Sequence, residues 1–404
     1  MAEAMAVSLR VFRNISDVSG ITNRNGTRLS GIRYGGGRNR DGRVCEEFYK
    51  KELAKNKELG IDHLYFIDGW QKGASSNSVK VGGVWENQWA REDYWDCNKE
   101  RFPNGLGGLV KEAKEAGFKV GMWYNPDKTG DYGNWRKDVD LVIARAKELG
   151  ITNVKFDGVV FSTKEGEANL LRIMREVVER TNGDVSIEID ISAGIRTGYY
   201  SAMSYGFLFL ENRYTDWLRY YPYTTLRNLW QLSKYVDPRR LRIEFLNGER
   251  NAHLYPDDPL APAHYKADYL FATAMFANPM AWFESTGLSD EFAGSLRGII
   301  GVYKRHRAAI HSCVIYPIGE EPDGFSWSGF QAHNKVDSSG FIVVFRDNSP
   351  VAKSSFKLNM PVGDYRFEVL AGESGEQSHD ASERSFTVDI GKLRRFAFFR
   401  YMPS

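Results

Sequence analysis

Acidic side chains end many of the apolar segments between residues 30 and 290 of this 404-residue sequence. They are Asp68, Asp157, Glu188 with Asp190, Glu211, Glu244 and Glu284. A carboxylate at the end of an apolar strand is costly to desolvate unless it is paired or functional. A structural ion pair with a neighbouring Lys or Arg explains any single one, but hardly the whole series. Converging carboxylates can hold a divalent cation or carry out nucleophilic and acid–base chemistry.

Tryptophans flank the same segment ends. They are Trp70, Trp85, Trp89, Trp95, Trp123 and Trp217. Aromatic rings offer flat apolar faces on which sugars stack, whereas a metal site has no need of them. Each tryptophan taken alone is more often part of a hydrophobic core. Beside the acids they favour a carbohydrate site, while a metal-assisted enzyme remains an alternative that predicts loss of activity to a chelator and recovery with Mg²⁺.

Strand-like and helix-like segments alternate from about residue 30 to 310, which is typical of a parallel sheet. The expected strands are 30–36, 63–68, 118–124, 153–158, 185–190, 206–211, 241–246 and 280–284, and amphipathic helices are expected at 46–60, 104–117 and 135–150. Eight such strands predict an α/β fold of the (β/α)8 TIM barrel type. A doubly wound sheet shares this alternation, but a glycine-rich phosphate turn after the first strand is missing. In a barrel the active site lies at the carboxyl ends of the strands.

Short β-rich segments separated by Gly, Pro, Asn and Asp turns replace this pattern after residue 310. The expected strands lie in 324–334, 340–348, 355–360, 364–372, 384–390 and 394–401. They predict a C-terminal antiparallel β-sandwich domain. The predicted division is an N-terminal extension at 1–28, a catalytic barrel at 29–311 and a β domain at 312–404.

Composition argues against several partners. The formal net charge is +2, from 54 basic and 52 acidic residues, so we expect neither nucleic acid nor a membrane as partner. The three cysteines, Cys45, Cys97 and Cys313, lie far apart in the sequence. Their spacing and their odd number argue against a disulfide framework. The histidines lack metal-ligand spacing, so no metal or cofactor is expected. A signal peptide is not visible, which predicts a cytoplasmic protein, or a secreted one if a signal has been removed.

Three motifs in order along the expected barrel resemble the α-galactosidase clan of retaining glycoside hydrolases, families 27 and 36, the melibiase-like enzymes. FIDGWQKG at 66–73 resembles the Asp-Gly-Trp segment of the clan. ERFPNGLGGLVKEAKEAGFKVGMWYNP at 100–126 resembles its Phe-Pro-x-Gly-Leu helix and the strand that follows. NVKFDG at 153–158 resembles its nucleophile strand. The likeness covers residues 60 to 290.

The resemblance implies a role for two carboxyl groups. Asp157 corresponds to the nucleophile of the clan. The acid/base residue is expected in the loop after the sixth strand, where Arg213 and Asp216 imitate the family 27 pattern with one residue fewer between them; Glu211 is the alternative. A retaining mechanism needs the two carboxyl groups about 5 to 5.5 Å apart.

Further residues are implied to bind substrate. Asp68 matches the residue that accepts hydrogen bonds from galactose hydroxyls. Lys155 stands two residues before the nucleophile, so strand alternation points it to the same side. On the fifth strand, Glu188 in the family 27 register contacts a free 2-hydroxyl, while in the family 36 register residues 192–194 take that part. The whole expected set is Asp68, Trp70, Trp85, Trp123, Lys155, Glu188, Asp190 and Arg213.

The function that follows is a retaining glycoside hydrolase that cleaves terminal α-galactosidic or closely related linkages through a covalent glycosyl-aspartate. Its partner is a carbohydrate, a galactoside or related oligosaccharide; a homo-oligomer stays open. A transglycosylase or an α-N-acetylgalactosaminidase could use the same site. A non-catalytic glycan-binding relative is a further alternative, for which Asp157→Asn would leave sugar binding intact.

Overall fold

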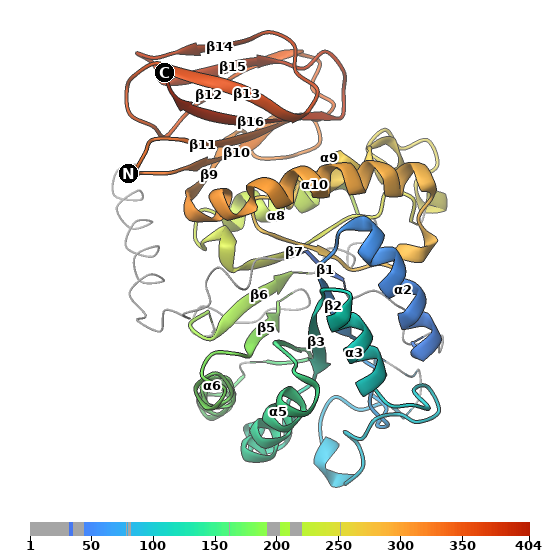
Figure 1. Cartoon of the computed structure of the whole chain (residues 1–404). Helices are drawn as coiled ribbons and strands as arrows, with labels where there is room; N and C mark the ends of the chain where they lie inside the picture. The colour runs from blue at the N-terminus through green and yellow to red at the C-terminus, as the bar shows by residue number, and fades with distance from the viewer. Residues whose placement is uncertain are drawn as a thin grey trace. The chain divides into compact units, whose positions relative to one another are not determined.

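The computed structural model describes residues 32–34, 44–77, 79, 82–160, 162–191, 203–210, 220–250 and 252–404. Most of its helices and strands are labelled in Figure 1. The described residues form two compact units. One contains 32–210 and 280–287, and the other contains 220–279 and 288–404.

The first unit is built on a curled parallel sheet in which β8, β1, β2, β3, β4, β5 and β6 are neighbours in that order. The bounds are β1 Arg33–Tyr34, β2 His63–Phe66, β3 Lys119–Tyr124, β4 Asn153–Phe156, β5 Ser186–Asp190, β6 Gly206–Leu210 and β8 Asn278–Ala281. Strands β2, β4 and β5 are buried along their whole length, as expected of strands covered on both faces.

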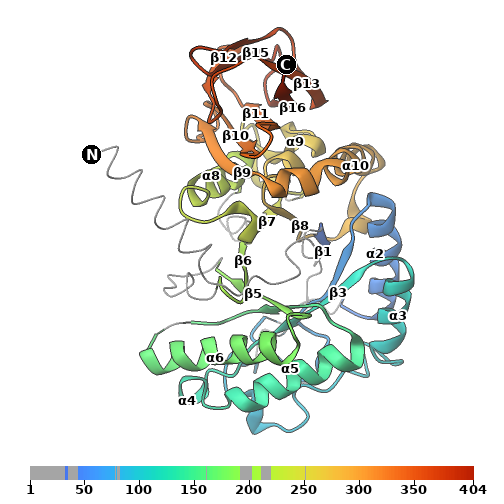
Figure 2. The same cartoon turned by 60° about the vertical axis from the view of Figure 1, so that its left-hand side comes forward.

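The helices of this unit are α2 (Glu46–Leu59), α3 (Gly107–Glu115), α4 (Thr129–Tyr132), α5 (Trp135–Leu149) and α6 (Lys164–Arg180). Helix α5 ends at Gly150, whose φ of 62° suits the left-handed cap. Helix α6 begins after Thr163, whose hydroxyl accepts from the backbone N–H of Gly166 at 2.9 Å. Figure 2 shows α5 and α6 side by side next to β5. The predicted helices at 46–60, 104–117 and 135–150 are confirmed.

One barrel strand differs from its expected place. We expected a strand at 280–284, but β8 occupies Asn278–Ala281 and pairs with β1 through Met280 and Ala281. That prediction is wrong in position, since the strand begins two residues earlier and ends three residues earlier than expected. Glu284 therefore does not end a strand; it lies in the segment that follows β8.

The second unit holds β7 (Leu241–Phe245), α8 (Pro222–Leu232), α9 (Ala267–Ala272) and α10 (Asp290–Ser312). Two antiparallel sheets follow α10. One has the order β13-β16-β11-β10-β9 and the other β12-β15-β14. Their strands are β9 Val314–Gly319, β10 Trp327–His333, β11 Gly340–Arg346, β12 Lys353–Lys357, β13 Tyr365–Gly372, β14 Gln377–Asp380, β15 Ser385–Asp389 and β16 Arg395–Pro403.

The two antiparallel sheets share a hydrophobic core, to which Val344 of β11, Phe399 of β16 and Phe386 of β15 belong. Aromatic contacts such as Phe276 with Phe398 and Tyr269 with Phe345 join the larger sheet to the α9 region. In the described ranges, no helix combines the length and the apolar character needed to cross a bilayer. The domain boundaries at 28/29 and 311/312 stay predictions.

Candidate active site

Asp157 directly follows β4, and each of its carboxylate oxygens accepts a hydrogen bond. Oδ1 accepts from the backbone N–H of Gly158 at 2.7 Å. Oδ2 accepts from Trp123 Nε1 at 2.8 Å and from Asn77 Nδ2 at 3.5 Å. Asp157 is 6% exposed. Hydrogen bonds to a carboxylate favour its charged form, which is the form that can act as a nucleophile.

Lys155 points to the same side of β4 as Asp157, as strand alternation predicts. Its Nζ lies 3.5 Å from Oδ2 of Asp157 and 2.8 Å from Oδ2 of Asp190 on β5. The ammonium also lies 4.2 Å from the ring centroid of Phe209 and 4.7 Å from that of Trp282. This buried cation is therefore shared between two carboxylates and faces two aromatic rings, which stabilise a desolvated positive charge.

Glu188 is fully buried on β5, where the strand register sets it between Lys155 of β4 and Phe207 of β6. Asp190 lies two residues further on the same strand. Both side chains thus belong to the buried polar cluster at the carboxyl half of β4 and β5. The sequence places acids here correctly, but the ion pair between Lys155 and Asp190 depends on the register of the two strands.

Asp68, after β2, is held by the loop that follows it. Oδ1 accepts from Gln71 Nε2 at 2.6 Å, and Oδ2 accepts from the hydroxyl of Ser75. Ser75 Oγ in turn accepts from the backbone N–H of Asn77 at 3.1 Å. One short loop therefore fixes the Asp68 carboxylate and also brings Asn77 to Asp157.

The expected tryptophans have three different surroundings. Trp70 is 1% exposed, donates from Nε1 to the backbone carbonyl of Trp123 at 2.9 Å, and stacks on Trp95. Trp123 donates its own indole N–H to the carboxylate of Asp157. Trp85 is half-buried, and its ring lies against Gly158. Trp70 thus supports Trp123, while Trp85 is next to the nucleophile.

Sequence reasoning missed a layer of buried polar residues behind Asp157. Asn125 donates from Nδ2 to the backbone carbonyl of Asp157 at 2.7 Å. Gln88, in the short 3-10 helix Gln88–Ala90, donates to Asn125 Oδ1. Asn125 follows β3 directly, so the rule that active-site residues follow strand ends could have found it. An amide is uncharged, so at a strand end it does not stand out as an acid does.

Asp138 on α5 lies deeper in this layer. Its Oδ1 accepts from the hydroxyl of Tyr124 at 2.6 Å and from Trp89 Nε1 at 2.8 Å, and its Oδ2 accepts from the backbone N–H of Asp127 at 3.3 Å. Burial raises the pKa of Asp138 to about 7, against the hydrogen bonds from Tyr124 and Trp89, which lower it. The Asp138 carboxyl group therefore connects Trp89, in the loop before α3, to Tyr124, at the end of β3.

Four expected site residues lie outside the described residues. They are Glu211, Arg213, Asp216 and Trp217. The turn at 192–194, which the family 36 register would use, also lies outside them. The nucleophile half of the predicted site is therefore described, and the acid/base half stays a prediction.

Local sequence similarity links the chain to known enzymes, although no family model matches it. It is 28% identical over 93 residues to Alpha-galactosidase Mel36A of Lactobacillus acidophilus, which covers 23% of this chain and 11% of that protein. It is 31% identical over 70 residues to Alpha-galactosidase AgaA of Geobacillus stearothermophilus, covering 17% of this chain and 8% of that protein.

The likeness to solved structures extends over nearly the whole chain. The crystal structure of the GH36 alpha-galactosidase AgaA from Geobacillus stearothermophilus matches with a TM-score of 0.69 at 15% identity, over 93% of this chain and 55% of that chain. A variant of AgaA in complex with raffinose matches with a TM-score of 0.67 at 14% identity, over 98% and 58%. The chain is similar to α-galactosidases of glycoside hydrolase family 36, in local sequence and in fold. The resemblance stated from the three motifs is thereby confirmed.

The chain spans little more than half the length of the solved enzymes it matches. At such low identity the structural likeness shows a shared fold. Among the described residues, no group of three or more His, Cys, Asp or Glu side chains is arranged to hold a metal ion.

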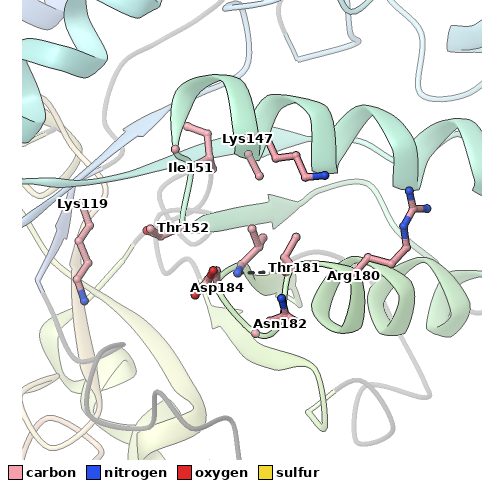
Figure 3. Close-up of a pocket in the computed structure, with 12 residues that line it drawn as sticks. Lys119, Lys147, Ile151, Thr152, Arg180, Thr181, Asn182 and Asp184 are labelled. Atoms are coloured by element: carbon pink, nitrogen blue, oxygen red, sulfur yellow. Dashed lines mark hydrogen bonds between the residues drawn. The ribbon is translucent and has the colours of Figure 1, made fainter.

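A pocket of about 540 Å³ lies at the other end of the same strands. Figure 3 shows residues that line it, among them Lys119, Thr152 and Arg180. Lys119 begins β3 and Thr152 precedes β4, whereas Asp157 follows β4. None of the lining residues is aromatic, and two helix carboxyl ends bring partial negative charge there. The pocket is therefore separate from the candidate active site.

Proposed function

We propose that the chain is a retaining glycoside hydrolase that cleaves terminal α-galactosidic or closely related linkages. The observation that carries the proposal is the carboxylate of Asp157, which receives hydrogen bonds from Trp123 and Gly158 with the Lys155 ammonium beside it. A buried, hydrogen-bonded carboxylate at the end of a parallel strand is equipped to attack an electrophilic carbon. Relatives named as α-galactosidases supply the substrate class.

In the first step a carboxylate oxygen of Asp157 attacks the anomeric carbon of the sugar. The bond from that carbon to the glycosidic oxygen breaks, and the departing oxygen takes a proton from the acid/base residue. A covalent glycosyl-aspartate results. In the second step water gives a proton to the same acid/base residue and attacks the anomeric carbon, and the bond to Asp157 breaks. Two inversions give net retention.

We assign the acid/base role to Asp216, with Glu211 as the alternative. The assignment rests on the sequence alone: Arg213 and Asp216 follow the sixth strand in the order that the family 27 pattern has. The acid must keep its proton near neutral pH while Asp157 is ionised, and the nearness of a second carboxylate favours that division. The eight-stranded (β/α)8 barrel and the C-terminal β-sandwich are parts of the same proposal.

Substrate contacts are assigned to the side chains around Asp157. Asp68 would accept hydrogen bonds from sugar hydroxyls, because its loop already orients both of its oxygens. Trp85, half-buried beside Gly158, would provide an apolar face for the sugar. Glu188 and Asp190 would lie toward carbon two of the sugar, which favours a free hydroxyl over an acetamido group.

Release of nitrophenol from a panel of nitrophenyl glycosides tests the proposal. The panel contains the α-galactoside, the α-N-acetylgalactosaminide and the β-arabinopyranoside. We expect the α-galactoside to be cleaved fastest, and Asp157→Asn to lose turnover while it still binds galactose. Preference for the acetamido sugar would identify the α-N-acetylgalactosaminidase alternative. Release from no glycoside, with sugar binding unchanged in Asp157→Asn, would favour a glycan-binding protein instead.

A further inference from the structure

Both backbone polar groups of Asp157 are held by residues at the end of β3. Its N–H donates to the carbonyl of Tyr124 at 2.9 Å. Its carbonyl accepts from the side-chain amide of Asn125 at 2.7 Å. The first contact continues the ladder between parallel strands. The second is made by a side chain, in the place where the ladder has already ended at Phe156.

The peptide that Asn125 holds is also the peptide that orients the nucleophile. The carbonyl of Asp157 and the N–H of Gly158 belong to one planar unit. Asn125 binds the oxygen of that unit, and the N–H at its other end donates to Asp157 Oδ1 at 2.7 Å. Rotation of this peptide would break both contacts together. The direction of one carboxylate oxygen is therefore coupled to the amide of Asn125.

The amide of Asn125 is itself oriented by Gln88. Gln88 Nε2 donates to Asn125 Oδ1, which leaves Asn125 Nδ2 facing the carbonyl of Asp157. Both side chains are fully buried. A buried amide that is bonded at both ends has one favoured orientation, because turning it over would set two acceptors against each other.

Glycine at position 158 leaves room for this arrangement. Its φ of 63° is in the left-handed region. A Cβ there would lie 2.7 Å from a ring carbon of Trp85 and 2.8 Å from Asn125 Nδ2. Asn125 and Trp85 therefore pack directly on the peptide that follows the nucleophile.

We propose that Asn125 is a positioning residue for Asp157: held by Gln88, its amide fixes the peptide between residues 157 and 158 and thereby the carboxylate that attacks the sugar. The inference rests on the proposed function. Asn125 acts through Asp157 and does not touch the substrate, so its loss should slow the chemical step and leave sugar binding intact.

The test compares Asn125→Leu with Asn169→Leu. Asn169 on α6 also donates from Nδ2 to a backbone carbonyl, that of Asp131 at 3.0 Å, but this carbonyl belongs to α4 and not to the nucleophile. Both variants lose one amide-to-carbonyl bond and keep a similar side-chain volume. We expect Asn125→Leu to lower kcat about 10- to 100-fold with KM changed less than about threefold, and Asn169→Leu to keep wild-type kinetics.

A second variant covers the possibility that Asn125→Leu does not fold. At a pH high enough to ionise the new carboxyl, Gln88→Glu can only accept from Asn125, so it would turn the amide over and face Asn125 Oδ1 to the carbonyl of Asp157. The rate of covalent inactivation by a 2-deoxy-2-fluorogalactosyl fluoride reports the first chemical step alone. We expect this rate at saturating reagent to fall in Gln88→Glu, with the half-saturating concentration unchanged.

The outcomes separate the inference from the proposed function. A wild-type chain that releases no nitrophenol and takes up no label overturns the proposed function, and this inference with it. An active wild type whose Asn125→Leu and Gln88→Glu variants keep its kcat overturns the positioning role only. A change confined to KM also overturns it, because that result would make Asn125 a substrate contact.

Discussion

Lys155 lies closer to Asp190 than to Asp157: its Nζ is 2.8 Å from Oδ2 of Asp190 and 3.5 Å from Oδ2 of the nucleophile. The cation thus has a firm partner on the neighbouring strand and still faces the nucleophile. With this arrangement the nucleophile does not have to neutralise Lys155 alone. The carboxylate keeps a positive neighbour while both of its oxygens stay bound to hydrogen-bond donors.

Removing Asp190 should destabilise the protein. Asp190→Asn takes away the 2.8 Å carboxylate partner of an ammonium that is 2% exposed, and breaking such a buried pair costs about 3–5 kcal/mol. The double variant with Lys155→Met should recover part of this cost, since the buried ammonium that lost its 2.8 Å partner is removed as well. Chemical unfolding at equilibrium measures both. The matched control is Asp140→Asn, which breaks the exposed pair with Arg180 and should cost less than about 1 kcal/mol.

Trp123→Phe should slow catalysis by removing the indole donor to Asp157 Oδ2. A hydrogen bond to a charged group contributes about 1.5–3 kcal/mol, so kcat/KM should fall roughly 10- to 100-fold. Trp230→Phe is the control. It loses an indole hydrogen bond to the backbone carbonyl of Ile318, and both residues belong to the unit that does not contain Asp157. It should keep wild-type activity. Equal rates for Trp123→Phe and wild type would show that this contact is irrelevant to the chemistry.

Gly158→Ala should abolish most activity, because the new Cβ would collide with Trp85 and Asn125. Gly130→Ala is its control, since Gly130 has a similar φ of 57° but open space around the added Cβ. Both variants carry the backbone strain of a left-handed alanine, about 1 kcal/mol. Thermal unfolding and turnover are measured for both variants. Together they separate the effect of backbone strain from the effect of displacing Trp85 and Asn125. If both variants lost activity equally, strain alone would be the cause.

Asp138 should make stability depend on pH. Its pKa rises from 3.8 to about 7 on burial, so between these values the folded protein binds more protons than the unfolded chain. Its contribution to stability is full below pH 3.8 and is lost as the pH rises through about 7, at no more than about 1.4 kcal/mol per pH unit. Asp138→Asn should remove this slope. Unfolding free energies of both proteins from pH 4 to 8 test it; parallel curves would contradict it.

Turnover should not need a divalent metal ion. Protein dialysed against EDTA should cleave the nitrophenyl α-galactoside at the untreated rate, because the proposed mechanism uses carboxyl groups and water only. Added Mg²⁺ should change nothing. Activity that disappears with EDTA and returns with Mg²⁺ would instead favour the metal-assisted alternative.

Strand ends could be predicted from the sequence because apolar runs and their closing acids are local patterns. Asp68, Asp157 and Asp190 were found in this way. The Lys155–Asp190 pair could not, since it depends on the register between β4 and β5. The relay from Gln88 through Asn125 joins two loops distant in sequence, and no local pattern marks an amide that binds a backbone carbonyl.

Two strands of the antiparallel sheets were also missed, for physical reasons of their own. β9 contains Pro317 and lies at the edge of its sheet, where a missing N–H is tolerated. β14 has the polar sequence QSHD and pairs only with β15. Neither shows the alternation of apolar and polar residues by which strands are recognised.

Trapping the covalent intermediate tests the central claim most directly. The wild-type chain is incubated with a 2-deoxy-2-fluorogalactosyl fluoride, digested, and the labelled peptide is sequenced by mass spectrometry. We expect one fluorosugar per chain, attached to the carboxylate of Asp157 in the segment NVKFDG. A label on any other residue would contradict the account.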